Sequence, residues 1–183
     1  MRRSLPNFLV MVPHRDARLP LRAWSGALFA AGLPGAWSFP WVAPLAALDG
    51  AISDEKLKPL ARALREISRP SDGKFAAGAL ALAAFPFFAE GEDLRVFGPH
   101  LDIALDGALF ELAEACALRP ISPVVLGAAL LRGPAPGGLP PSPPVSFRAA
   151  ALAVMRFRPL DSGGESGGYS FEWEIGKLRW LPK

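Results

Sequence analysis

The sequence contains two histidines, and each has a polar neighbour with which it could do acid–base or anion chemistry. His100 and Asp102 are two residues apart, so in an extended strand both would face the same side as an acid–base pair. His14 stands beside Arg15 in a charged stretch that would tolerate a phosphate. Phosphodiester cleavage needs such groups, because an attacking hydroxyl loses a proton and a leaving alkoxide gains one. The alternative is ordinary polar surface: a solvated strand edge around His100 and a charged loop around His14.

Metal chemistry and a cofactor are not expected. With a single cysteine and two histidines, oxygen ligands would have to complete any coordination shell. Cys116 is the only cysteine, which rules out a disulfide within the chain and favours a cytoplasmic location. Apolar runs stay below the roughly 20 residues of a membrane helix, so we expect no membrane association.

The charge balance gives little indication of a partner. The formal net charge is +3, and arginines outnumber lysines, which suits paired contacts to phosphate or carboxylate groups. A lysine-rich tract typical of bulk nucleic-acid binding is missing from the sequence.

Two apolar, β-branched stretches would have to position any site. Residues 121–131 (ISPVVLGAALL) and 38–48 (SFPWVAPLAAL) share a Pro-x-Val triplet and read as buried strands. Their separation of roughly half the chain suggests two lobes with a groove between them. Phe39 and Trp41 would share one face of the first strand, with Trp37 extending it.

Further strands are predicted over residues 7–13, 74–85, 94–105, 146–158 and 169–180. Helices are predicted from Pro20 to Gly32, after Ser53 with a regular part from near Lys58, and from Asp106 to before Pro120. Residues 133–145 form a surface loop rich in proline and glycine. In the last strand the apolar residues alternate with polar ones, which predicts a half-buried strand.

This order of elements resembles the 2H phosphoesterase superfamily, which includes RNA 2′,3′-cyclic phosphodiesterases and LigT-like proteins. Ala43–Leu48 running into Ser53-Asp54-Glu55 resembles the first family motif, and Ser122–Gly127 (SPVVLG) resembles the second, normally Pro-His-x-Thr-Leu-Gly. The resemblance implies one bilobal α+β domain over residues 1–183. Two antiparallel sheets with outer helices would surround a central groove.

The family's activity depends on two His-x-Thr/Ser motifs whose imidazoles face each other across the groove, and this chain departs from both. In the second motif Pro123 replaces the histidine and Val125 the hydroxyl residue. In the first, the same-facing candidates are Pro40, Val42 and Pro44, while the opposite face offers Phe39, Trp41 and Ala43. Proline and valine cannot transfer protons, so the resemblance implies that phosphodiesterase activity is lost.

Two functions follow as hypotheses. The first is a ligand-binding or interaction protein, with a nucleotide, an RNA end or an apolar ligand in the interlobe groove and possible contacts from Trp41, Arg15 and Arg156. The second is a divergent phosphoesterase that acts on cyclic phosphates or RNA ends with relocated catalytic residues, drawn from His100, Asp102 and His14. They differ in whether a histidine opens into the groove. The oligomeric state is not predicted.

Overall fold

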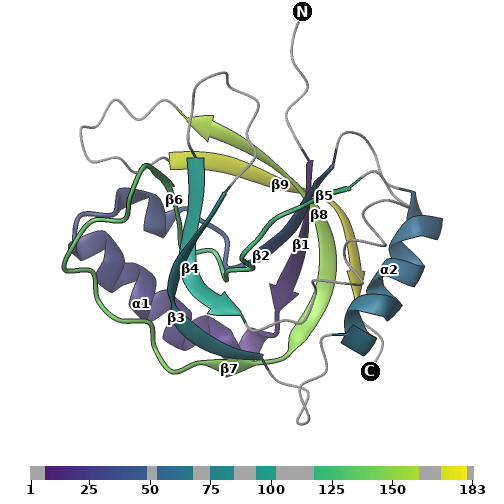
Figure 1. Ribbon diagram of the computed structural model, residues 1–183, viewed down its shortest axis with the longest axis horizontal. Coiled ribbons are helices and arrows are strands. Elements are labelled where there is room, and N and C mark those ends of the chain that lie inside the picture. The colour runs from purple at the N-terminus through teal and green to yellow at the C-terminus, as the bar shows by residue number, and fades with distance from the viewer. Residues whose placement is uncertain are drawn as a thin grey trace, which may run out of the picture.

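A computed structural model describes residues 7–48, 53–67, 75–84, 94–101, 118–160 and 170–180. The fold is α+β, with two antiparallel sheets and helices packed against them (Figure 1). Asp102 and most of the helix predicted from Asp106 lie outside the described residues, and the predicted last residues of that helix, Leu118 and Arg119, instead belong to strand β5 (Leu118–Pro120). Within the described residues no helix is long and apolar enough to cross a membrane.

The larger sheet has five strands in the order β5-β2-β1-β8-β9. Their bounds are Leu118–Pro120 (β5), Ala43–Leu48 (β2), Asn7–Pro13 (β1), Ala149–Leu160 (β8) and Ser170–Trp180 (β9). The central strand β1 is apolar on both faces because side chains pack on both sides of it. Phe8 and Val10 enter one buried cluster, while Leu9 and Met11 enter another.

The smaller sheet has four strands in the order β6-β4-β3-β7. Their bounds are Ala129–Arg132 (β6), Leu94–Leu101 (β4), Phe75–Ala84 (β3) and Ser146–Phe147 (β7). Strand β3 pairs antiparallel with β4, and β8 with β9. The strand predicted over residues 146–158 is divided, because its first two residues form β7 of the smaller sheet and the residues from Ala149 onward belong to β8 of the larger one.

Helix α1 (Arg18–Ala30) packs on the four-stranded sheet (Figure 1). Its buried residues Trp24 and Leu28 pack with Phe97 of β4 and neighbouring residues of β6. Pro20 lies in the first turn, where the missing N–H is not needed. The short 3-10 helix η1 (Arg15–Ala17) precedes α1.

Helix α2 (Asp54–Ile67) packs through Leu57 and Ala61 on the five-stranded sheet. It begins at Asp54, so the expected regular start near Lys58 is wrong. Pro59 lies inside the helix, where it lacks a backbone donor and its ring crowds the carbonyl of Glu55. The acidic residues of the first turn interact favourably with the positive end of the helix dipole. The buried apolar face also stabilises the helix across Pro59.

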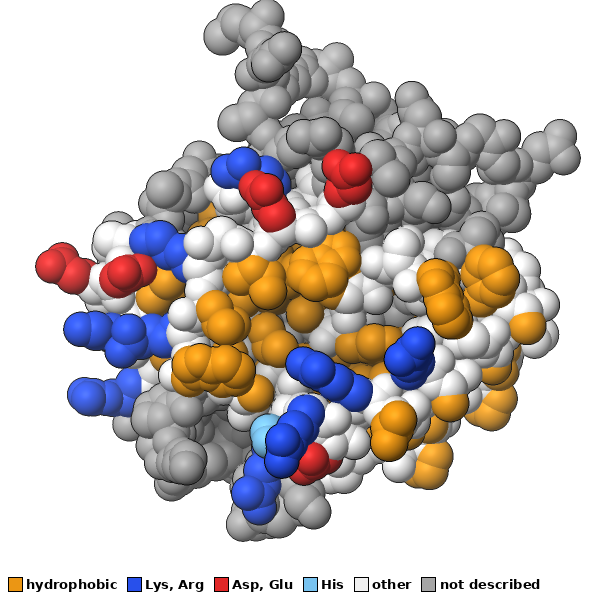
Figure 2. All heavy atoms as spheres, turned by 180° about the vertical axis from the view of Figure 1, so that it is seen from behind, with side chains coloured by type: hydrophobic (Ala, Val, Ile, Leu, Met, Phe, Trp, Pro, Cys, Tyr) orange, Lys and Arg blue, Asp and Glu red, His pale blue; other side chains and the backbone are white. Residues whose placement is uncertain are grey.

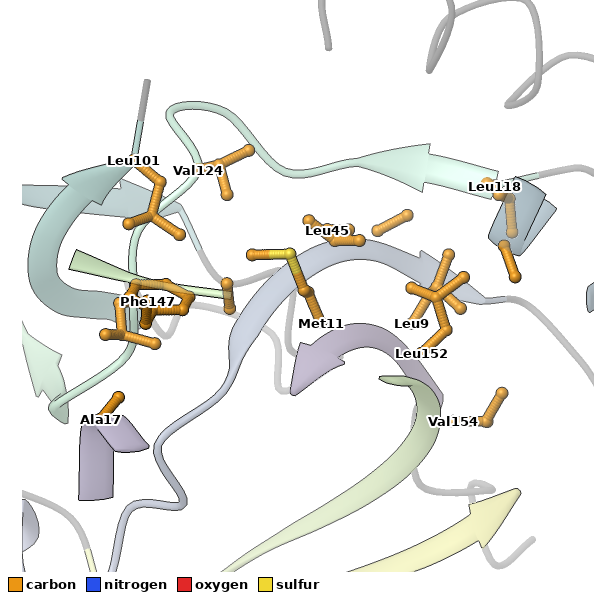
Figure 3. Close-up of a cluster of buried hydrophobic side chains, with 14 of the residues drawn as sticks. Leu9, Met11, Ala17, Leu45, Leu101, Leu118, Val124, Phe147, Leu152 and Val154 are labelled. Atoms are coloured by element: carbon orange, nitrogen blue, oxygen red, sulfur yellow. The ribbon is translucent and has the colours of Figure 1, made fainter. Parts of the chain in front are cut away.

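One large apolar cluster connects elements from both sheets (Figure 3). Met11, Leu45 and Leu152 come from the five-stranded sheet, whereas Leu101 and Phe147 come from the four-stranded sheet. The two sheets therefore share a core and are not packed as separate bodies.

The strand predicted over residues 38–48 is shorter than expected. Pro34–Trp37 forms a second 3-10 helix, η2, and strand β2 begins only at Ala43. Phe39 and Trp41 consequently do not share a strand face: Phe39 is buried, while Trp41 packs beside Trp24 with ring centroids 5.6 Å apart. Prolines deprive this stretch of ladder donors, which explains why the strand starts late.

The strand predicted over residues 121–131 is also wrong over most of its length. Residues 121–128 bend at Ser122 and Pro123 and contain only an isolated bridge at Val125, and regular pairing starts with β6. The apolar run correctly indicates burial, since nearly every residue from Val124 to Leu131 is buried. The segment has no regular ladder because its backbone partners alternate between two different strands.

Residues 133–145 connect β6 to β7 as a loop without regular structure, as expected. The loop is nevertheless packed, because Trp24 Nε1 donates a hydrogen bond to the carbonyl oxygen of Pro140 at 3.1 Å. Ala135 and Leu139 of the loop also pack against the cluster beneath α1.

Candidate functional site

The two motif-like stretches lie directly against each other. The Gly127 amide donates to the Val42 carbonyl at 2.8 Å, and the Ile121 amide donates to the Leu45 carbonyl at 2.9 Å. Residues 121–128, which we call the connecting segment, therefore run alongside β2 of the five-stranded sheet.

The other side of the connecting segment bonds to β4 of the four-stranded sheet. The amides of Leu126 and Ala128 donate to the carbonyls of Pro99 and Phe97, at 2.9 and 2.7 Å, and Leu101 donates to Val124. The segment thus links the two sheets through backbone hydrogen bonds. Any site at the positions that the resemblance assigns to the two motifs would be built where the two sheets meet.

Val42 and Val125 belong to one buried cluster, which we call the motif cluster. They are 4% and 1% exposed. Pro44 is buried and pairs with Val10, which puts it on the same side of the sheet as that residue. The cluster draws on both sheets and consists of Phe8, Val10, Phe39, Val42, Ala47, Ala83, Leu94, Val96, Ile121, Val125, Leu130, Ala153, Met155 and Phe157.

Aromatic rings fill the space beside the motif positions. Phe157 lies between Phe8 and Phe39. Its ring centroid is 5.4 Å from that of Phe8 and 5.8 Å from that of Phe39. The Phe39 ring also rests on Gly127, where an added Cβ would come within 2.2 Å of it. Among the described residues Ser25 on α1 is the only polar side chain in the buried class, so the motif cluster offers no proton donor or acceptor.

The remaining motif positions are only partly enclosed. Pro40 and Pro123 are half-buried, and the peptide bond between Ser122 and Pro123 is cis. The structure thus brings Val42, Pro44 and Val125 to one side of the sheet junction, with the two outer prolines at intermediate exposure.

His100 lies close to the second motif position. It forms an isolated antiparallel bridge with Val125, and bridged residues of an antiparallel pair project to the same side. The side chain of His100 is half-buried, and its backbone is approached closely by Gly78 of β3. The pairing with Asp102 cannot be described, because that residue lies outside the described ranges.

His14 lies at the end of β1, where it caps η1. Its backbone N–H donates to the Arg148 carbonyl at 2.7 Å, and its Nδ1 is 2.9 Å from a carboxylate oxygen of Asp16. The His14 side chain is 40% exposed and lies outside the motif cluster, and Arg15 is exposed. This arrangement fits the polar-surface alternative for His14.

The possible ligand contacts lie on different elements. Trp41 packs beside α1, Arg15 is part of η1, and Arg156 is on β8. Arg156 alternates with Met155 and Phe157 of the motif cluster, so it occupies the opposite face of the sheet, where it pairs with Glu174 at 2.9 Å. The structure does not gather these three residues into one site.

Within the described ranges, no group of three or more His, Cys, Asp or Glu side chains could hold a metal ion. A hollow of about 340 Å³, which the sequence did not predict, lies on the exposed side of α2. Glu55, Lys58, Pro59 and Arg62 line this hollow. Charges of both signs at spacings of three and four residues are ordinary for a solvated helix face, so no sequence signal would have marked it.

Comparison with solved structures gives a similarity to the crystal structure of TT0787 of Thermus thermophilus. The two chains are 16% identical, the similarity covers 97% of this chain and 98% of that chain, and the TM-score is 0.42. No protein-family model matches the sequence, and no curated protein does so either. A structural similarity at this level assigns neither a family nor a function.

Proposed function

We propose that this protein is a 2H phosphoesterase-like protein that has lost phosphodiesterase activity and acts as an interaction protein. One observation carries the proposal: Val42 and Val125, which stand at degenerate motif positions, are both buried in the motif cluster. Side chains of this type cannot accept or donate a proton, and their enclosure leaves no room for a phosphate between them.

The burial of these positions also bears on the kind of partner. A phosphodiester carries a charge, and placing it among the Phe39, Phe157 and valine side chains would cost its hydration without any compensating donor. A nucleotide or RNA end in the motif cluster is therefore disfavoured. An apolar ligand would have to displace packed aromatic rings. An interaction partner would therefore bind to the exposed surface of the protein.

A relocated phosphoesterase activity is the second candidate, and the position of His100 favours it. His100 lies opposite Val125 and projects to the same side, at intermediate exposure. An imidazole there could serve as one member of an acid–base pair at the rim of the motif cluster. His14 is already engaged with Asp16, which leaves His100 as the stronger candidate for this chemistry.

Hydrolysis of 2′,3′-cyclic nucleotides and of short RNA ending in a cyclic phosphate tests the two candidates. Wild type is compared with His100→Ala and His14→Ala, each checked for an unchanged melting temperature. We expect no turnover above the buffer blank in any of the three proteins, because the motif positions lack proton-transfer groups.

Turnover by the wild type would contradict the proposed loss of activity. Loss of that turnover in His100→Ala, with His14→Ala unaffected, would assign the chemistry to His100. A parallel titration of the wild type with the same nucleotides, followed by melting temperature, separates binding without turnover from absence of binding.

A further inference from the structure

Strand β9 forms an edge of the five-stranded sheet. Among the described residues it pairs only with β8, so the backbone groups along its other side have no strand partner there. The strand runs from Ser170 to Trp180, which is long for an edge strand. Natural proteins generally shield such edges, because they template pairing with another chain.

The apolar side chains of β9 are exposed, contrary to the expectation of a half-buried strand. Trp173, Ile175, Leu178 and Trp180, which we call the β9 patch, are 43%, 49%, 45% and 68% exposed. Apolar side chains gather across the middle of one face of the molecule, with charged side chains around them (Figure 2). Isolated exposed apolar residues are common, but a contiguous row of them is not. The row therefore indicates an interaction surface.

A bulge at Gly176 creates this row. The register shifts there, because Ile175 pairs with Met155 whereas Lys177 pairs with Val154. Strict alternation would place Leu178 and Trp180 on the opposite face from Trp173 and Ile175. The one unpaired residue brings all four to the face that also carries the β8 members of the motif cluster.

The same bulge separates two acidic from two basic residues on the other face. Glu172 and Glu174 precede it, and Lys177 and Arg179 follow it. Glu174 and Lys177 already contact Arg156 and Asp54, at 2.9 and 3.0 Å. Their side chains are still 65% and 40% exposed, so each can accept a further partner.

The charges of β9 are complementary to those of a second β9 strand that runs antiparallel to it. In an antiparallel pair of β9 strands centred on the bulge, Glu174 faces Lys177 of the second copy and Glu172 faces its Arg179. Trp173 then lies opposite Leu178, so apolar residues also meet on the other face. Shifting this pairing by two residues in either direction leaves the charged and apolar side chains on their own faces. It keeps ion pairs of only one kind, whereas the centred pairing forms two kinds. Parallel pairing in register places like charges together.

We propose that β9 is a self-association edge, and that a second copy of this chain pairs with it antiparallel around a twofold axis at Ile175 and Gly176. The two five-stranded sheets would form one continuous sheet, and the two β9 patches would lie side by side on one face, with Trp173 against Leu178 of the second copy. A closed twofold contact uses the β9 edge of both copies and leaves neither β9 edge free for a third copy. This inference does not depend on whether the motif cluster is catalytic.

Sedimentation velocity of the full-length protein over a range of concentrations provides the test. The wild type is expected to shift from the 19.5 kDa chain to twice that mass as concentration rises. Glu174→Lys and Lys177→Glu each place like charges across the twofold axis. Each is expected to raise the dissociation constant by about tenfold or more, and far-UV circular dichroism checks that each variant keeps the wild-type fold.

An equimolar mixture of the two single variants isolates the contact between copies. In the mixed pair, one copy carries lysine at both positions 174 and 177, and the other carries glutamate at both. Opposite charges therefore face each other again across the axis, and association is expected to return to near the wild-type strength. Arg22→Glu on α1, which packs on the other sheet, makes the same charge change as Lys177→Glu away from β9 and should leave association unchanged.

Three results would overturn the proposal: a wild type that stays monomeric at every concentration, single variants that associate like the wild type, or a mixture no tighter than its components. Open-ended growth beyond a dimer would overturn it as well, because a closed twofold contact cannot propagate.

Discussion

Two glycines allow the connecting segment to approach its neighbours closely. An added Cβ at Gly98 of β4 would lie 1.8 Å from the Leu126 carbonyl oxygen, and at Gly127 the Phe39 ring occupies the same space. At Gly98 the obstacle is backbone of a residue that also donates a hydrogen bond to β4, so it cannot simply rotate away. These glycines are required by contact distance, since neither needs a left-handed backbone.

Gly98→Ala is therefore expected to destabilise the protein by about 2–4 kcal/mol, because the connecting segment must move and its bonds to β4 must stretch. Gly26→Ala in α1 is the matched control. Nothing lies within 4 Å of its Cβ position, so the helix should gain about 0.5–1 kcal/mol. Urea unfolding of both variants measures the difference. Equal stability of Gly98→Ala and wild type would show that the segment does not pack as described.

Helix α1 holds the proline-rich loop of residues 133–145 in place. The indole of Trp24 is 5% exposed and combines apolar packing against Phe97 with the single hydrogen bond to Pro140. The loop contains several prolines that lack a backbone donor, so a side-chain contact of this kind anchors it where a ladder cannot.

Trp24→Phe keeps an aromatic ring but removes the donor to Pro140. We expect a loss of about 1–2 kcal/mol and faster hydrogen exchange at the amides of residues 137–139, because the Pro140 carbonyl loses its partner. Trp37→Phe serves as the control, since Trp37 is 63% exposed, and it should change stability by less than about 0.5 kcal/mol. Unchanged exchange in Trp24→Phe would contradict an anchoring role.

The two sheets of the molecule share two of its three buried clusters, and the third lies between α1 and the four-stranded sheet. The motif cluster and the cluster of Figure 3 each contain side chains of both sheets, and the connecting segment bonds to both. Loss of either sheet would expose apolar surface of the other. The two sheets should consequently depend on each other for their stability.

We expect a single cooperative unfolding transition. Far-UV circular dichroism and tryptophan fluorescence should report the same urea midpoint, at a protein concentration low enough to avoid self-association. Gly98→Ala should move both midpoints together. Two separated transitions, or a variant that shifts only one probe, would indicate that the sheets unfold as independent lobes.

The local patterns of the sequence determined most of the elements. Apolar alternation and runs located β1, β3, β8 and β9, and the apolar face with its capping residues located α1 and α2. The run from Ile121 to Leu131 correctly indicated burial. These predictions succeed because they depend on neighbours within one turn or one strand, which the sequence lists directly.

The features that concern function depend on contacts between residues far apart in the sequence. The connecting segment reads as a strand, but its partners on β2 and β4 lie far away in the sequence, so no local pattern reveals that it links two sheets. Likewise, alternation in β9 shows which side chains share a face up to the bulge, but not whether anything covers that face. Burial depends on what packs across from a residue, and the bulge at Gly176 is fixed by pairing with β8.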